Sequence, residues 1–179
     1  MQKINIFWFR RDLRLHDNAG LYHALKGNYP VLPLFICDKL ILDKLEEKTD
    51  RRIEFIRDAL VAMHNELEKI NSSLEVLHAT PEVAFKKLLR DYNVQAVFTN
   101  HDYEAYAIER DDLIKNLLSQ KNIKLVSYKD QVIFEKDEVI KEDGKPYTVY
   151  TPYSKKWKSL LTDFHCKSYP VNKYANNFF

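Results

Sequence analysis

Short, continuous runs of apolar residues recur along the chain at intervals that suit the strands of a buried sheet. Five runs are predicted to be strands, at residues 4–9, 34–37, 74–79, 96–99 and 124–128. Because their apolar positions are continuous rather than alternating, we expect both faces of each strand to be covered, as in a parallel sheet. Pro33 cannot donate a ladder hydrogen bond, so we expect it to mark the start of the second strand.

Segments with helical periodicity separate these runs. The clearest lies within residues 50–70, where apolar residues three and four positions apart form one stripe: Ile53, Ile56, Leu60, Met63, Leu67 and Ile70. Thr80 and Pro81 suit the N-cap and first turn of another helix. Asp17-Asn18 suits the start of the first helix, and a further helix is predicted over about 105–120.

The alternation of strands and helices predicts an α/β fold with an open, doubly wound, five-stranded parallel sheet and helices on both faces. The pattern changes after residue 128. We expect a hairpin around Asp143-Gly144 and a short helix from about Thr151. The last stretch has no periodicity, so it predicts no regular element.

The composition fits one ordinary domain and excludes several classes of protein. The chain has 179 residues, enough for a real core, and its formal net charge of +2 gives no overall sign of a polyanion-binding surface. Two distant cysteines and scattered histidines predict neither a disulfide framework nor a metal site. No apolar run approaches the ~20 residues of a membrane helix, and no signal peptide precedes the first strand. We therefore expect a soluble, cytoplasmic protein without membrane contact.

Charged residues directly follow three of the predicted strands, in the segments "RRDLRLHDN" (10–18), "CDK" (37–39) and "TNHDYE" (99–104). Ligands of open α/β sheets bind beyond the carboxyl ends of the strands, so these loops can converge on one crevice. A solvated network of salt bridges explains the same charges, and both interpretations stay open. The chain has three glycines, no G-x-G-x-x-G motif and no P-loop, which argues against a phosphate-cradling enzyme. No nucleophile arrangement is recognisable, so no catalytic residue is assigned.

Four segments resemble, in the same order, the DNA photolyase and cryptochrome family. They are "WFRRDLRLHDNAGLYHAL", "FICD" with the downstream "RRIEFIRDAL", "NHDYEAYAIERD" and "YTVYTPYSKKWK". The resemblance spans nearly the whole chain and implies the Rossmann-like α/β domain with which photolyases begin. Together with the right-handed crossover rule, it predicts the strand order 3-2-1-4-5.

The resemblance implies that this chain is the N-terminal light-harvesting domain of a deoxyribodipyrimidine photolyase, a lyase that repairs pyrimidine dimers in DNA under light. Residues 1–165 would form this antenna domain, and residues 166–179 would begin the linker to a helical domain. That helical domain, absent from this chain, would hold FAD and bind damaged DNA. The fragment alone is therefore expected to be non-catalytic and free of FAD.

Two alternatives to the photolyase stay open. The first is the same domain of a cryptochrome, a signalling photoreceptor. The second is a free-standing nucleotide-binding module of the stress-protein or electron-transfer-flavoprotein type, which would usually carry a glycine-rich phosphate loop.

The resemblance also implies a pocket for an antenna chromophore. Relatives with a deazaflavin or flavin antenna use the loops after strands one, two and four and an arginine in the following helix. The matching positions here are Arg10, Arg11, Cys37, Asp38, Arg52, Asp102 and Glu104. Relatives that bind folate can carry an Asn-Glu pair where this chain has Tyr106 and Ala107, so deazaflavin or FMN is expected rather than folate. Each candidate also has a structural explanation, as a solvated arginine, a surface carboxylate or a buried residue at a strand end.

Without the helical domain, aromatic residues of the last segment are expected to be exposed: Tyr147, Tyr150, Tyr153, Trp157, Phe178 and Phe179. An apolar patch of this kind invites association, so the fragment is expected to self-associate weakly. Residues after about Ser168 are expected to be held only by such contacts or to be mobile.

Overall fold

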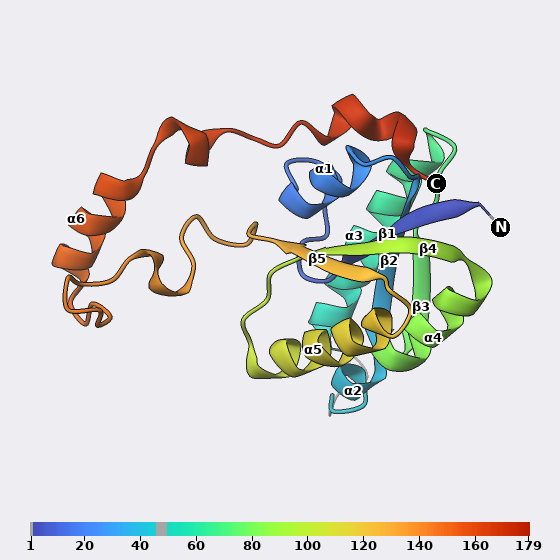
Figure 1. Cartoon of the computed structure of the whole chain (residues 1–179), viewed down its shortest axis with the longest axis horizontal. Helices are drawn as coiled ribbons and strands as arrows, with labels where there is room; N and C mark the ends of the chain where they lie inside the picture. The colour runs from blue at the N-terminus through green and yellow to red at the C-terminus, as the bar shows by residue number, and fades with distance from the viewer. Residues whose placement is uncertain (1, 46–49) are drawn as a thin grey trace.

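A parallel sheet with the strand order β3-β2-β1-β4-β5 organises the computed structural model, which describes residues 2–45 and 50–179 (Figure 1). Its strands are β1 (Lys3–Phe9), β2 (Val31–Asp38), β3 (Glu75–Ala79), β4 (Asn93–Asn100) and β5 (Lys124–Tyr128). The predicted sheet, its order and its five strands are confirmed. The strand order reverses between β1 and β4, at the centre of the sheet.

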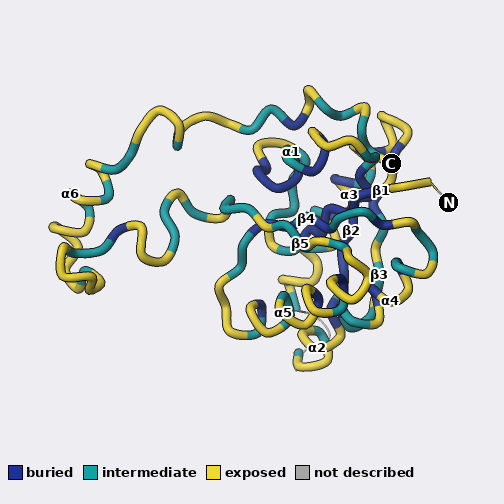
Figure 2. Tube along the Cα trace, in the orientation of Figure 1, coloured by how far each residue is buried: buried dark blue, intermediate teal, exposed yellow. Residues whose placement is uncertain are grey.

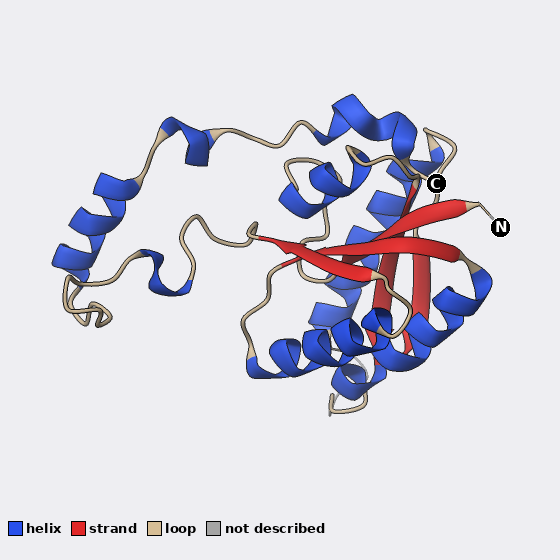
Figure 3. Ribbon diagram, in the orientation of Figure 1, coloured by secondary structure: helices blue, strands red, loops and turns tan. Residues whose placement is uncertain are grey.

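Helices cover both faces of the sheet, as predicted (Figure 3). The helices of the sheet region are α1 (Ala19–Leu25), α2 (Lys39–Leu42), α3 (Arg51–Glu68), α4 (Pro81–Asp91) and α5 (Ala105–Ser119). Apolar residues of α1 and α3 form one core cluster, and those of α4 and α5 form the other. The expected caps are present, since Asn18 accepts a hydrogen bond from the Leu21 amide and Thr80 accepts one from the Val83 amide.

Successive side chains of β1 point to opposite faces, which explains its continuous apolar run. Ile4, Ile6 and Trp8 pack in the cluster with α4 and α5. Phe7 and Phe9 pack in the cluster with α1 and α3. All five residues are buried, so the continuous apolar run of β1 indicates a strand that is covered on both faces.

Helix α1 approaches β4 so closely that position 20 has no room for a side chain. A Cβ atom on Gly20 would lie 2.5 Å from Oδ1 of Asn100 and 2.8 Å from the Phe7 ring. The Gly20 amide instead donates to that Asn100 oxygen at 2.9 Å. Asn100 also donates to Asn18 at 2.9 Å, so one buried amide ties β4 to the start of α1.

Strand β2 begins two residues before Pro33, so the expectation that Pro33 starts the strand was wrong. Pro33 is tolerated because β2 first pairs with β3 one residue later, where Leu34 lies opposite Glu75. On β2, Val31 forms an isolated parallel bridge with Phe178, and its carbonyl accepts the Phe179 amide at 2.8 Å.

The last residues, 166–179, fold back along the domain, and we call this segment the strap (Figure 1). Its 3-10 helix η3 (Val171–Asn177) contacts α1, and Val171 is buried. Nδ2 of Asn177 lies 2.7–3.2 Å from three backbone carbonyl oxygens, which share its two hydrogens. They are those of Leu25, Gly27 and Tyr29. The expectation that residues after about Ser168 form no element and lack contacts with their own domain was wrong. Side chains of Val171, Tyr174 and Phe178 also pack against the core cluster of α1 and α3. These positions are irregularly spaced, so the strap shows no helical or strand period in the sequence.

Residues 129–165, which we call the arm, extend away from the sheet and are mostly exposed (Figures 1 and 2). They contain η1 (Lys136–Glu138), α6 (Tyr150–Leu160) and most of η2 (Asp163–Cys166). Helix α6 confirms the short helix expected from about Thr151. The expected hairpin around Asp143-Gly144 is absent from the described structure. A tight turn replaces it, with Gly144 at a φ of +78°. The Gly144 amide donates to the Lys141 carbonyl at 3.0 Å, and the Lys141 amide donates to the Lys145 carbonyl at 2.9 Å.

Candidate functional site

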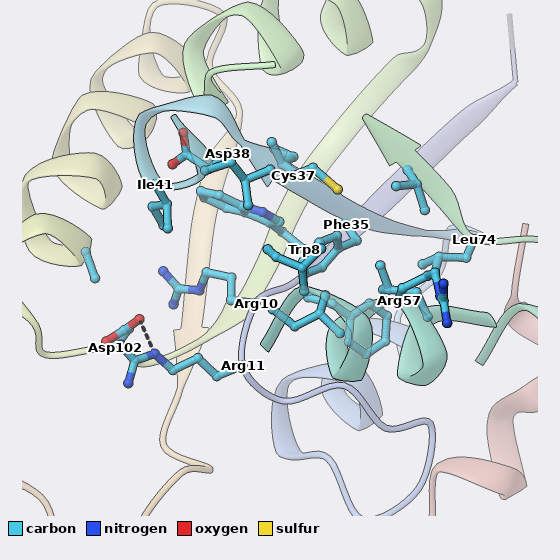
Figure 4. Close-up of a pocket in the computed structure, with 18 of the residues that line it drawn as sticks. Trp8, Arg10, Arg11, Phe35, Cys37, Asp38, Ile41, Arg57, Leu74 and Asp102 are labelled. Carbon is cyan, nitrogen blue, oxygen red and sulfur yellow. Dashed lines mark ion pairs between the residues drawn. The ribbon is translucent and has the colours of Figure 1, made fainter. Parts of the chain in front are cut away.

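A cavity of about 760 Å³ opens at the carboxyl ends of β1 and β2 and is bounded by α2, α3 and α5 (Figure 4). Its walls are mainly apolar, with Trp8 and Phe9 from β1 and Phe35 and Ile36 from β2. The cavity lies beyond the carboxyl ends of the strands, the side on which open α/β sheets bind ligands. The loop after β4, across the switch point, contributes Asp102 and Glu104 to its lining. The volume lies within the roughly 300–1,000 Å³ typical of small-molecule sites.

The first half of α3 forms one wall of this cavity. Farther along the same stripe, Leu60, Met63 and Leu67 are buried in the core. Ile53, by contrast, is 37% exposed and lines the cavity together with Ile56. The apolar stripe predicted from the sequence is therefore only partly covered by the protein itself. An apolar ring in the cavity would cover Ile53 and Ile56, whereas Ile70 lies outside the lining.

Arg10 lies at the charged end of the cavity, directly after β1. Its Nη1 atom contacts both carboxylate oxygens of Asp111 on α5, at 2.6 and 2.7 Å, and its Nη2 atom donates to the Asn100 carbonyl. The Arg10 side chain is only 7% exposed. The Arg10 guanidinium is therefore fixed by β4 and α5, which both lie far from it in the sequence. It is not a freely solvated charge.

Arg11 forms a second ionic cluster at the rim, with Asp102 and Glu104 from the loop after β4. Its Nε atom lies 3.4 Å from Asp102, and its Nη2 atom pairs with Glu104 (Figure 4 shows the Asp102 contact). The hydrogen bond to Glu104 raises the pKa of Arg11, and burial opposes the shift. Arg11 is half exposed and Glu104 more so, which places this cluster where the cavity meets solvent.

Two residues of α5 that were not singled out as site residues also line the cavity. The Arg110 guanidinium carbon lies 4.9 Å from the ring centre of Trp8 and 5.7 Å from that of Tyr106. The Tyr106 hydroxyl donates to Asp38, and burial and this contact raise the pKa of Tyr106. Asp38 also caps α2 by accepting the Leu40 amide at 2.9 Å. Tyr106 and Arg110 stand four positions apart in a helix, a spacing that could have indicated their shared face.

The structure brings six of the seven sequence candidates to the cavity lining: Arg10, Arg11, Cys37, Asp38, Asp102 and Glu104. Burial raises the pKa of the Cys37 thiol. Arg52 does not line the cavity, since its guanidinium is exposed and bonds to Asp50 at the start of α3. Arg57, five positions later, is the α3 arginine that does so. In this structure Arg52 therefore lies outside the cavity lining, and a role for it in binding stays a prediction.

The described residues hold neither a candidate metal site nor a candidate membrane span. Within residues 2–45 and 50–179, no group of three or more His, Cys, Asp or Glu side chains could hold a metal ion. No helix in this described part combines the length and apolar character needed to cross a membrane. The lining residues and ion pairs make the cavity a mainly apolar slot with ionic groups at one end.

Comparison with known proteins decides the family. The model of the DNA photolyase family matches residues 5–171. The chain belongs to the DNA photolyase family. The deoxyribodipyrimidine photo-lyase of Synechococcus sp. (strain PCC 6301) is 30% identical to this photolyase-family chain over 154 residues, which are 86% of this chain and 32% of that protein. Cryptochromes of several animals are also among the relatives of this photolyase-family domain.

Two solved photolyase structures share the fold of this family member. The class III photolyase of Agrobacterium tumefaciens is 25% identical, with a TM-score of 0.81, and the match covers 96% of this chain and 34% of that one. The photolyase of Sulfolobus tokodaii is 26% identical, with a TM-score of 0.77 over 97% of this chain and 41% of that one. The Sulfolobus structure contains two FAD molecules, with a novel light-harvesting cofactor implied for it. The chain spans about a third of the length of the curated photo-lyases that it matches.

Proposed function

We propose that this chain is the N-terminal light-harvesting domain of a DNA photolyase and that its cavity holds the antenna chromophore. The observation that carries the proposal is the mainly apolar cavity of about 760 Å³ at the carboxyl ends of β1 and β2. A light-absorbing ring system needs an apolar slot and a few fixed polar partners, and this cavity has both. Photolyase-family homologues bind FAD and an antenna chromophore, which supports the assignment.

The cavity suits a flavin or a deazaflavin better than a folate. A flat tricyclic ring would lie between the apolar α3 wall and the side chains of β1 and β2, which line the cavity on either side. Tyr106 and Ala107 stand where folate-binding relatives can carry Asn and Glu. Tyr106 already donates to Asp38, and Ala107 has no polar side-chain atom for a folate ring.

Tryptophan fluorescence tests this ligand class directly. The chain has two tryptophans, so a Trp157→Phe variant leaves Trp8, in the cavity wall, as the single reporter. Titration with FMN or a 5-deazariboflavin should quench Trp8, because the ligand ring would lie beside the indole. Methenyltetrahydrofolate should not quench it at equal concentration. FAD belongs in the same series because the Sulfolobus photolyase contains two FAD molecules.

A matched pair of variants locates the binding. Ile53→Asp places a carboxylate in the cavity wall, whereas Ile70→Asp places one outside the cavity lining. The two isoleucines have similar exposure, 37% and 43%. Ile53→Asp should weaken binding of the flavin at least about tenfold, since burying an unpaired charge is costly, and Ile70→Asp should leave it unchanged. Equal effects of both substitutions, or quenching by folate alone, would contradict the proposal.

The roles of the two segments follow from this function. We infer that residues 1–165 form the antenna domain and that residues 166–179 begin the connection to a helical domain. In the whole protein that domain would hold FAD and bind damaged DNA. The cryptochrome relatives support a second candidate, the same domain of a signalling photoreceptor. Light-dependent repair of pyrimidine dimers by the whole protein would favour the photolyase, and its absence despite bound FAD would favour the cryptochrome.

Weak self-association of the isolated chain remains a proposal. Several apolar side chains of the arm are largely exposed, with Tyr150 at 78% and Phe164 at 69%. Such a surface favours association when nothing covers it. Sedimentation equilibrium should show a mass that rises with concentration, and a strict monomer at high concentration would contradict this.

A further inference from the structure

Two aromatic side chains that can lose an electron line the cavity, and both face the same cation. These side chains are Trp8, which is 2% exposed, and Tyr106. The guanidinium of Arg110 lies over both rings, at 4.9 Å from the centre of Trp8 and 5.7 Å from that of Tyr106. Arg10 adds a second guanidinium, 5.4 Å from the centre of Trp8.

The charge at this position is well fixed and is shielded from water. The Arg110 side chain is 9% exposed. Arg10 and Arg110 both pair with the single carboxylate of Asp111, at 2.6 and 3.1 Å. Asp102 lies 4.0 Å from Arg110 but is itself shared with Arg11. Two guanidiniums that share one close carboxylate leave a net positive charge beside Trp8, and arginine keeps its charge at neutral pH.

An excited flavin-type ring readily takes an electron from a neighbouring indole or phenol. Transfer from Trp8 gives an indole radical cation and a ligand radical anion, and return of the electron restores both and loses the excitation as heat. Transfer from Tyr106 would also pass its hydroxyl proton to Asp38, which already accepts that hydrogen bond. Each transfer makes the donor side more positive by one charge, as an indole radical cation at Trp8 or as a neutral phenoxyl radical beside a protonated Asp38 at Tyr106. A cation over the rings disfavours both changes.

We propose that Arg110, supported by Arg10, protects the excited state of a ligand in this cavity from quenching by Trp8 and Tyr106. The inference rests on the proposed function, since it concerns a light-absorbing ligand in the same cavity. The same positive charge also favours an electron on the ligand. Arg110 lies directly over both donor rings, however, so its charge acts on the donors at contact distance. The bound ligand would then stay excited long enough to transfer its excitation energy.

Time-resolved fluorescence of bound FMN or a bound 5-deazariboflavin tests this role separately from binding. Arg110→Met removes the charge at similar length and should shorten the lifetime of the bound ligand at least about threefold. Arg110→Lys keeps the charge and should retain most of the lifetime. Arg90→Met, which removes an exposed arginine of α4 outside the cavity lining, should change neither binding nor lifetime.

Removing the two donors should reverse the effect. In the Arg110→Met protein, adding Trp8→Phe and Tyr106→Phe should restore the long lifetime, because phenylalanine does not donate an electron under these conditions. An unchanged lifetime in Arg110→Met with ligand bound would overturn this inference and leave the proposed function intact. A short lifetime that persists without Trp8 and Tyr106 would also overturn it. Failure of both ligands to bind the unsubstituted protein would overturn the proposed function and this inference together.

Discussion

Position 20 tests the packing of α1 against the sheet at the scale of a single residue. Gly20→Ala would force a methyl group against Asn100 and the Phe7 ring, both less than 3 Å away. Because these neighbours are buried, we expect a loss of about 1–3 kcal/mol in the free energy of unfolding, measured by urea denaturation. Gly27→Ala is the comparison, since its nearest contacts would be 3.1 and 3.4 Å. A loss no larger than that of Gly27→Ala would contradict the close approach.

Asp50 gives a prediction about pH at the same scale. Its carboxylate accepts hydrogen bonds from the side chain and the amide of Arg52, which lower the pKa of Asp50 to about 2. Because the pKa of Asp50 is depressed in the folded protein, this cap stabilises the start of α3 at pH values above the ordinary carboxyl pKa. Its contribution is lost as the pH falls from about 4 to about 2.

An NMR titration of the Asp50 carboxyl carbon should show this low midpoint. Arg52→Ala should move the midpoint upward, because it removes the side-chain hydrogen bonds, whereas Arg51→Ala should change it less. An ordinary midpoint in the unsubstituted protein would show that the Asp50–Arg52 contact does not persist in solution.

Individual residues were predictable from the sequence where the signal is local. Residue type and position limited the first cap to Asp17 or Asn18, and the structure shows that it is Asn18. Arg10 could be placed after a buried strand, but its pairing with Asp111 joins residues 101 positions apart and left no local trace. Arg52 was expected in the pocket because of its position in the segment. The directions of the side chains show that Arg57, and not Arg52, lines the cavity.

At the scale of elements, the strands and long helices were predictable because each has its own apolar pattern. The cavity was not predictable from the apolar pattern. The stripe of α3 has the same sequence pattern whether other residues or a cavity lie against it. The hairpin failed for a related reason. Asp-Gly permits a tight turn, but the flanking residues have no sheet to join, so the turn forms without strands.

Helix α2 depends on a contact made by another element. Asp38 caps its start and also accepts the hydroxyl of Tyr106 on α5. Tyr106→Phe removes the second contact and should destabilise α2 locally by about 1 kcal/mol, or about fivefold in opening. Amide hydrogen exchange at Leu40 should quicken accordingly. Tyr103→Phe, at an exposed tyrosine, is the control and should leave Leu40 unchanged. Unaltered exchange in Tyr106→Phe would show that α2 is held by Asp38 alone.

At the scale of the whole molecule, the strap decides how the end of the chain is held. Asn177→Ala removes the two side-chain N–H donors that three backbone carbonyls share, at the end of α1 and in the loop after it. We expect a loss of about 1–3 kcal/mol in the free energy of unfolding, because the carbonyls lose their donor in a partly buried site. Asn176→Ala, at an exposed neighbour, is the matched control for urea denaturation. Equal stability of the two variants would mean that the strap adds little to the fold.

The bridge between Val31 and Phe178 also brings the two ends of the chain together. Asn5 of β1 pairs with Val31, and Val31 pairs with Phe178 on its other side, so the first strand and the last residues are two strand spacings apart, roughly 10 Å. A short peptide could join them without disturbing either. The chain is therefore close to a closed ring, and a circular permutant opened at the exposed Gly144 turn would retain the same sheet, cavity and strap. The order in which the elements are synthesised is separable from the way in which they pack.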